Sequence, residues 1–195
     1  MSDRPPARER ILAAAVRQIA SEGIDGVRIA RIAMAAGVST SLVHYHFDSR
    51  DALLAQALDY SYARAGDARI SSGELPADSH AQRLQSMIDQ CLPTSQELED
   101  DWVLWVELWL RAVRNPELRT VAEELYARLH AWFADEIKAG IASGEFARCD
   151  PDEVADRAIA LLDGYGIRTL IGDSAISIER ARGAVGGALA RELGL

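Results

Sequence analysis

The stretch that decides the fold is AGVSTSLVHYHF, residues 36–47. Gly37 can adopt the left-handed backbone that a sharp turn between two helices requires. Ser39 is a good N-cap for a short helix from about Thr40 to Phe47. This helix carries hydroxyl, imidazole and phenol side chains, whereas a core helix would be apolar and a solvated one would prefer Lys and Glu. The stretch therefore predicts a helix that presents polar side chains to a partner.

Helical spacing of apolar residues continues on both sides of this stretch. A first helix is expected over about 7–22, ended by Gly23, and a second over about 28–36, directly before the turn. Two short helices joined by a tight glycine turn form a helix-turn-helix, whose second helix enters the major groove of DNA. A longer helix, capped by Asp48 or Ser49, should follow and reach about residue 70.

The rest of the chain is also expected to be helical. No segment alternates with period two, so strands are not expected. Further helices are expected, between breaks rich in Gly, Pro, Ser and Asp, over about 79–91, 95–114, 117–142, 152–172 and 177–193. The predicted fold class is all-α with about nine helices. A three-helix DNA-binding domain over 1–50 would precede a helical ligand-binding and dimerisation domain over 51–195.

Charge is distributed unevenly along the chain of 195 residues. The formal net charge of −9 by itself argues against a nucleic-acid partner. Residues 1–50, however, carry seven arginines against five acidic residues, a net charge of +2, and the remainder carries −11. A basic N-terminal segment on an acidic body is compatible with DNA binding by that segment.

The sequence contains no apolar run of membrane-spanning length and no signal-peptide pattern. We therefore expect a cytoplasmic protein.

The polar side chains of the expected third helix suit a DNA interface. Hydroxyl groups reach phosphates or base edges, and imidazole and phenol groups reach the backbone beside the groove. Leu42, Val43 and Phe47 would hold the helix to its domain. Two alternatives stay open: Ser39 acts only as a cap, and Tyr45 or His46 packs against the following helix. His44 and His46 point to different faces of a helix, so no metal site is expected there.

Residues 8–54 resemble the DNA-binding segment of the tetracycline-repressor (TetR) family. The resemblance lies in the Ile32–Ala33 pair, in Ala36–Ser39, in Tyr45–Phe47 and in Arg50, a basic residue that opens the fourth helix. The resemblance implies an all-α, dimeric protein that usually represses genes until a small ligand binds its C-terminal domain.

Several positions depart from the usual family pattern. Val27 stands where a Thr often caps the second helix, Thr40 and Ser41 replace a frequent Lys-Gly pair, and His44 replaces a frequent Tyr. The resemblance therefore implies DNA binding without implying a base preference. The residues expected to contact DNA are Arg28, Ser39, Thr40, Ser41, His44, Tyr45, His46 and Arg50.

The C-terminal body carries a second resemblance. LLDGYGIR, residues 161–168, and WVELWLRAVRNPEL, residues 105–118, are similar to the C-terminal domain of choline-responsive, BetI-type members of the family.

Trp102, Trp105 and Trp109 lie at positions i, i+3 and i+7 and so line one side of a helix. They predict an aromatic-walled cavity, with core or dimer packing as the alternative. An acid beside aromatic rings is how proteins hold cations, and Glu107 and Asp163 lie in the two motifs. A cationic or amphipathic effector is therefore expected. The expected ligand-binding residues are Trp102, Trp105, Trp109, Glu107, Tyr126, Phe133, Asp163 and Tyr165.

The last expected helix is rich in small residues, among them Gly183, Gly186 and Gly187. Glycine in a helix costs about 1 kcal/mol relative to Ala, so close packing should compensate. With LLDGYGIR, this helix resembles the pair through which the family dimerises, and Leu161, Gly183 and Gly187 are expected at the interface. Close packing within one subunit is the alternative.

These features together predict a homodimeric, ligand-responsive regulator that a small molecule releases from a near-palindromic operator. No nucleophile–base pair, phosphate-binding glycine loop or metal-ligand cluster is readable, so an enzyme, a cofactor, a metal and a membrane partner are not expected. The alternative is a helical ligand-binding or interaction protein whose DNA binding is weakened or lost.

Overall fold

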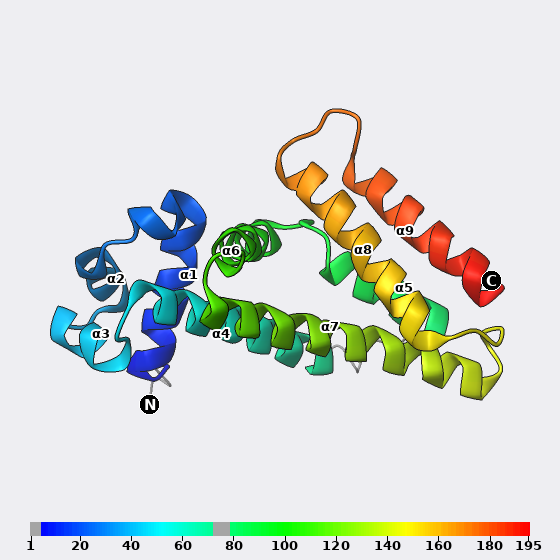
Figure 1. Ribbon diagram of the computed structural model, residues 1–195, viewed down its shortest axis with the longest axis horizontal. Coiled ribbons are helices and arrows are strands. Elements are labelled where there is room, and N and C mark those ends of the chain that lie inside the picture. Colours follow the sequence, from blue (N-terminus) through cyan, green and yellow to red (C-terminus); the bar gives the residue numbers. More distant parts are fainter. Residues whose placement is uncertain (1–4, 72–78) are drawn as a thin grey trace. The chain divides into compact units, whose positions relative to one another are not determined.

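The computed structural model describes residues 5–71 and 79–195; the side chains of Arg50 and of residues 62–71 lie outside the description. Within these residues the protein is all-α, as predicted, and contains no strand (Figure 1). The helices are α1 (Ala7–Gly26), α2 (Ile29–Ala36), α3 (Thr40–His46), α4 (Arg50–Ser71), α5 (His80–Gln90), α6 (Gln96–Ala112), α7 (Pro116–Ser143), α8 (Pro151–Leu170) and α9 (Ile178–Leu193).

The first helix is interrupted where the sequence predicts its end. Gly23 has φ 68° and ψ 165°, so the regular part of α1 stops there and a short helical turn continues to Gly26. A positive φ is accessible to glycine at little cost, which explains this residue at the break. Ser49, rather than Asp48, caps α4, because its Oγ accepts a hydrogen bond from the Ala52 N–H at 3.0 Å.

The chain folds as two compact units. One unit comprises residues 1–70 and 103–123, and the other comprises 71–102 and 124–195, so far as these residues are described. Helices α6 and α7 each contribute one part to either unit.

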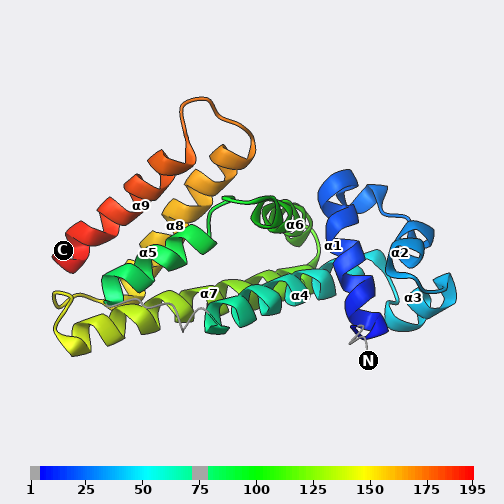
Figure 2. The ribbon, with the colours of Figure 1, turned by 180° about the vertical axis from the view of Figure 1, so that it is seen from behind.

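The first unit contains the predicted helix-turn-helix. Its core is formed by the inner faces of α1, α2 and α3 and the start of α4, where the fully buried side chains include Ile11, Leu12, Ile19, Ile32, Val43, Leu53 and Leu54. The α2–α3 pair lies against α1 in both views (Figures 1 and 2). Burial of these apolar side chains fixes the short helices α2 and α3, which would be marginal in isolation.

The second unit is a layered helical body. Helices α8 and α9 run side by side, and α5 lies against α9 (Figure 2). Its core gathers buried residues from α5, α7, α8 and α9, namely Met87, Ile88, Phe133, Ile137, Val154, Leu162, Val185 and Leu189. None of the helices in the described part of the chain has the length and apolar character needed to cross a membrane.

Candidate nucleic-acid interface and effector sites

The turn between α2 and α3 has the conformation that the sequence predicts. Gly37 has φ 65° and ψ 45°, its N–H bonds to the Met34 carbonyl at 3.1 Å, and the Val38 N–H bonds to the Ala33 carbonyl at 2.9 Å. This is the glycine-terminated helix end that satisfies the last carbonyls of a helix. The turn therefore fixes the direction in which α3 leaves α2.

Helix α3 presents a polar face to solvent. Ser39 caps it, since its Oγ accepts a hydrogen bond from the Leu42 N–H at 3.2 Å. Val43 and Phe47 are buried and anchor the helix, and Leu42 is half-buried. Tyr45 is 81% exposed, although it is a large aromatic residue. The other exposed residues of this stretch are Ser39, Thr40, Ser41 and His44.

Two further expected DNA contacts lie at helix boundaries. Arg28 is exposed and precedes α2, and its Nη1 lies 3.3 Å from the Asp25 carbonyl oxygen. Arg50 opens α4, and its side chain is outside the described part of the structure. His46 is half-buried, with its ring 5.3 Å from that of Tyr45 in an edge-on arrangement. Met34, which stands where basic residues are common in the resembling family and for which no role was predicted, is 78% exposed on α2.

Arg111 of α6 forms a charged cluster within the first unit. Its Nη2 lies 2.7 Å from Asp25 Oδ1, its Nη1 lies 3.1 Å from Asp51 Oδ1, and its Nε lies 3.9 Å from Glu107 Oε2. Glu107 also approaches Gly23 so closely that a Cβ on this glycine would lie 2.9 Å from Glu107 Oε1. The carboxylate of Glu107, expected beside an effector, therefore lies against Arg111 and the break in α1.

The tryptophans of α6 fall in both units. Trp105 and Trp109, in the first unit, have ring centroids 5.9 Å apart and planes inclined at 41°. Trp102, in the second unit, is buried, and its indole N–H donates to the Cys91 carbonyl at 3.2 Å. Its ring covers Gly166 of α8, where a Cβ would overlap the indole. Trp102 thus packs against the LLDGYGIR segment of α8.

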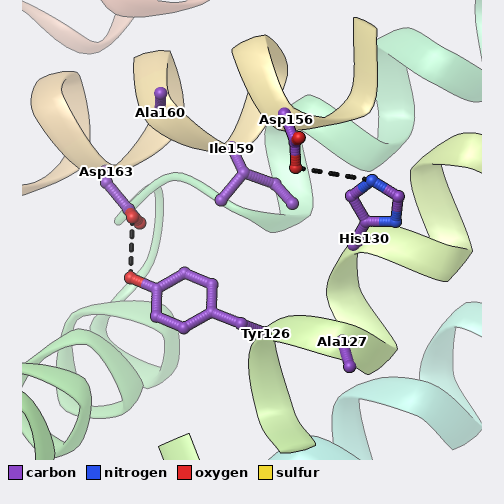
Figure 3. A pocket seen from close by; sticks show the side chains of 7 residues that line it. All are labelled: Tyr126, Ala127, His130, Asp156, Ile159, Ala160 and Asp163. Carbon is purple, nitrogen blue, oxygen red and sulfur yellow. Dashed lines mark hydrogen bonds and ion pairs between the residues drawn. The ribbon is translucent and has the colours of Figure 1, made fainter. Parts of the chain in front are cut away.

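A hollow of about 540 Å³ lies between α7 and α8 in the second unit (Figure 3). The phenol of Tyr126 donates a hydrogen bond of 2.7 Å to Asp163 Oδ2. His130 Nε2 lies 3.4 Å from Asp156 Oδ1 and 3.2 Å from the Asp152 carbonyl oxygen. The remaining lining residues are Ala127, Ile159 and Ala160.

Burial raises the pKa of Asp163, and the hydrogen bond from Tyr126 partly offsets this by stabilising the carboxylate. An ionised Asp163 is therefore a charge that would gain from a cation in the hollow. The hollow thus combines an acid, a phenol ring and apolar walls.

The structure brings together two of the predicted ligand residues, Tyr126 and Asp163, in this hollow. Phe133 is fully buried in the core of the second unit, and Tyr165 packs against that core. His130 and Asp156 also line the hollow and were missed. His130 lies four residues after Tyr126 and Asp156 lies seven before Asp163, so helical spacing was the available signal.

The small-residue face of α8 and α9 is open in the protomer. A Cβ on Gly164 or Gly183 would meet nothing within 4 Å among the described residues, and one on Gly187 would meet only Arg191, at 3.7 Å. Gly186 differs, because its Cβ would lie 2.9 Å from Gln85 Oε1 of α5. Packing inside the protomer therefore accounts for Gly186 and leaves the other three glycines without an intramolecular reason.

A helix-turn-helix with an exposed polar second helix, joined to a larger helical body, defines a DNA-binding transcriptional regulator. Residues 11–57 match the model described as bacterial regulatory proteins, tetR family, and residues 80–194 match that of the BetI-type transcriptional repressor, C-terminal. The chain belongs to the TetR family and has a BetI-type C-terminal domain. Members of this family regulate transcription and are not enzymes, and ligand-responsive repression is typical of them.

Named relatives agree with this assignment. The HTH-type transcriptional regulator BetI of Rhizobium meliloti is 27% identical over 90% of this chain and 83% of its own length. A TetR-family regulator from Rhodococcus sp. is 34% identical with a TM-score of 0.84, and the alignment covers 96% of this chain and 98% of that one. A regulator from Saccharomonospora viridis, solved in complex with choline, is also 34% identical, with a TM-score of 0.83 and 95% of both chains covered.

Proposed function

We propose that the protein acts in the cytoplasm as a homodimeric repressor, which leaves a near-palindromic operator when a small organic cation binds its C-terminal body. The observation that carries DNA binding is the exposed polar face of α3. The Gly37 turn and the Ser39 cap fix the backbone at the start of this helix. A recognition helix must be accessible to the major groove, and the polar residues at the start of α3 are exposed.

The residues of this interface divide by chemistry. Thr40 and Ser41 are short, exposed hydroxyl residues at the start of α3, the part of a recognition helix that contacts base edges. Arg28 and Arg50 flank the helix-turn-helix and are proposed to contact phosphates, with Tyr45 and the other polar residues of α3 beside them. Loss of a phosphate contact would weaken binding to all sequences, whereas a change at Thr40 would alter base preference.

Dimerisation is proposed to use the open face of α8 and α9. Leu161 is half-buried on α8, and Gly183 and Gly187 leave space on α9 that no described side chain of the protomer fills. A two-fold interface buries the same surface of both subunits, so a smooth self-complementary face suits it. The dimer would hold two recognition helices about one DNA turn apart, or a multiple of it, ~34–36 Å.

The effector is proposed to be a small organic cation such as choline. Three features support this: the Asp163 carboxylate in the hollow of α7 and α8, the phenol ring of Tyr126 beside it, and the choline complex of the relative from Saccharomonospora viridis. A cation gains from the carboxylate and from aromatic faces, whereas an anion there would need a basic partner. The ligand-binding role predicted for Trp105 and Trp109, which belong to the first unit, is a separate proposal that rests on the pairing of their rings.

The test is DNA binding by the purified protein to the region upstream of its own gene, with and without choline chloride. Tight binding should weaken with choline by about 5–150-fold, the usual range of coupling between two sites. Asp163→Asn should abolish the choline effect and leave DNA binding intact. Asp135→Asn, which removes an exposed acid of α7, is the matched control and should respond as the wild type does.

The outcomes separate the parts of the proposal. Absence of sequence-specific binding would contradict the operator, and binding that choline leaves unchanged would contradict the effector. If choline still releases the Asp163→Asn protein from DNA, the hollow between α7 and α8 is not the choline-binding site.

A further inference from the structure

Arg111 joins three separate segments of the first unit through one guanidinium group. Its partners are Asp25, in the last turn of α1, Asp51, in the first turn of α4, and Glu107, on α6 itself. The first two segments directly precede and follow the α2–α3 pair in the chain. Because a guanidinium offers donors in a rigid fork, Arg111 can fix the spacing of both segments at once.

Additional contacts bring α6 close to the same two segments. Asn115, which follows α6, donates from Nδ2 to Asp51 Oδ2 at 3.2 Å, and its Oδ1 accepts from the Glu117 N–H at the start of α7. On the other side, Glu107 lies close to the break in α1, with its Oε1 2.9 Å from the place that a Cβ on Gly23 would occupy. The end of α6 is therefore docked onto both borders of the helix-turn-helix.

The two ion pairs that Arg111 forms with Asp25 and Asp51 differ in their exposure to solvent, and the less exposed pair should be the stronger. The Asp25 side chain is 90% exposed, so solvent screens its pair with Arg111 strongly. The side chains of Arg111 and Asp51 are 25% and 40% exposed, and Asp51 is held by Asn115 as well. The Asp51 contact is therefore the stronger link, and it leads directly to the start of α4.

Helix α6 also carries the aromatic pair Trp105 and Trp109, which lie four residues apart and so share one face. Glu107 and Arg111 share a second face, and buried Leu104 and Leu108 lie between the two. A rotation or shift of α6 that changes the surroundings of the tryptophans must also move Arg111, because both are on one rigid helix. The contacts of Arg111 would then be remade or lost.

We infer that Arg111 is a positioning residue that holds the helix-turn-helix in its DNA-binding geometry and transmits the effector's influence to it through Asp51. The inference rests on the proposed function for its effector. Arg111 acts through the borders of the DNA-binding segment and contacts no base or phosphate. A ligand that prefers the arrangement in which this link is broken would lower DNA affinity by its difference in affinity for the two states.

The experiment measures DNA affinity, with and without choline chloride and at several salt concentrations, for full-length Arg111→Gln, Asp51→Asn and the double variant. Arg111→Gln should weaken DNA binding about 5–50-fold, which is within the usual range of coupling between sites. Choline should then change the DNA affinity of this variant very little. Choline affinity of the DNA-free protein should rise, because choline no longer has to break the link in order to bind its preferred state. The double variant should bind no more weakly than Arg111→Gln alone, because the two residues act as one link.

Two controls separate this role from others. Arg114→Gln removes the same charge from an exposed position three residues away and should behave as the wild type. Arg111→Lys keeps the charge without the fork, so it remains informative if Arg111→Gln fails to fold, and its choline effect should be at least halved.

Several results would overturn the inference. One is an Arg111→Gln protein whose DNA affinity and choline response both stay within twofold of the wild type. Another is a double variant whose loss of DNA affinity equals the product of the losses in the two single variants. A third is an Arg111→Lys protein that choline releases from DNA as it releases the wild type. The inference would also be refuted if the slope of log K against log salt concentration became shallower by about 0.9 in Arg111→Gln, because that change indicates the loss of a direct phosphate contact. If choline fails to release the wild type, the proposed effector fails, while DNA affinities of the single and double variants still decide whether Arg111 positions the interface.

Discussion

Substitution of Gly183 by Leu should break the proposed dimer without unfolding the subunit. In the protomer a Cβ at this position meets nothing within 4 Å among the described residues, so the larger side chain points into open space. Replacing Gly by Leu also favours the helix by up to ~0.8 kcal/mol. At a close-packed interface, however, the added carbons overpack the contact at a cost of ~1–3 kcal/mol.

The two-fold symmetry of the proposed dimer doubles that cost. Each change occurs once in each subunit, so Gly183→Leu should weaken dimerisation by ~2–6 kcal/mol, or roughly 30- to 20,000-fold in Kd. Adding Gly187→Leu should weaken it further. DNA affinity should fall with the loss of the dimer although residues 1–50 are unchanged.

Sedimentation equilibrium measures the dimer Kd, and circular dichroism verifies that the variant keeps its helical content. Ala139→Leu, which adds bulk at an exposed position of α7, serves as the control and should remain dimeric. A Gly183→Leu, Gly187→Leu protein that dimerises as tightly as the wild type would refute the reasoning and place the interface elsewhere.

Three further changes test the local structure. Ser39→Ala removes the cap of α3 and should cost ~1 kcal/mol, lowering Tm by about 2–4 °C in a chain of this size; an unchanged calorimetric Tm would show that the cap contributes nothing. Gly166→Ala should push Trp102 off α8, costing ~1–3 kcal/mol and altering Trp fluorescence, whereas an unchanged spectrum and a higher Tm would contradict the packing. Burial raises the pKa of Asp163, so its ionisation opposes folding above the folded-state pKa and not below its ordinary value of 3.8. Asp163→Asn should therefore raise Tm at pH 7, with the gain shrinking as pH falls toward 3.8 and below, and a gain independent of pH would disprove this cause.

The helices could be predicted because their signals are local. Apolar spacing, the Ser39 cap and the Gly37 turn act over a few residues, and the structure has a helix in each place where one was expected. The interruption at Gly23 was also readable, although the further turn to Gly26 was not. That turn is kept by packing, since Ile24 and Val27 on either side of it are fully buried.

The contacts of the candidate sites were less predictable because they join distant parts of the chain. The i, i+4 spacing of Glu107 and Arg111 was visible, but their approach to Gly23 and Asp51 depends on how α6 docks on α1 and α4. The tryptophan stripe of α6 likewise shows no local sign that Trp102 belongs to a different compact unit from Trp105 and Trp109.

The hollow between α7 and α8 illustrates the same limit. His130 and Asp156 resemble ordinary charged positions on solvated helix faces, and only the packing of the two helices brings them to one place. Asp163 could be proposed because its motif singled it out. Its hydrogen bond with Tyr126 required the tertiary structure.

Selection of binding sites from a pool of random DNA duplexes by the purified full-length protein tests the central claim most directly. The account predicts enrichment of a near-palindrome whose half-sites lie about one helical turn apart, or a multiple of it, ~34–36 Å. It also predicts that a change at Thr40 alters the selected bases without abolishing selection. A protein that selects no sequence even at low salt, where phosphate contacts are strongest, would contradict the account.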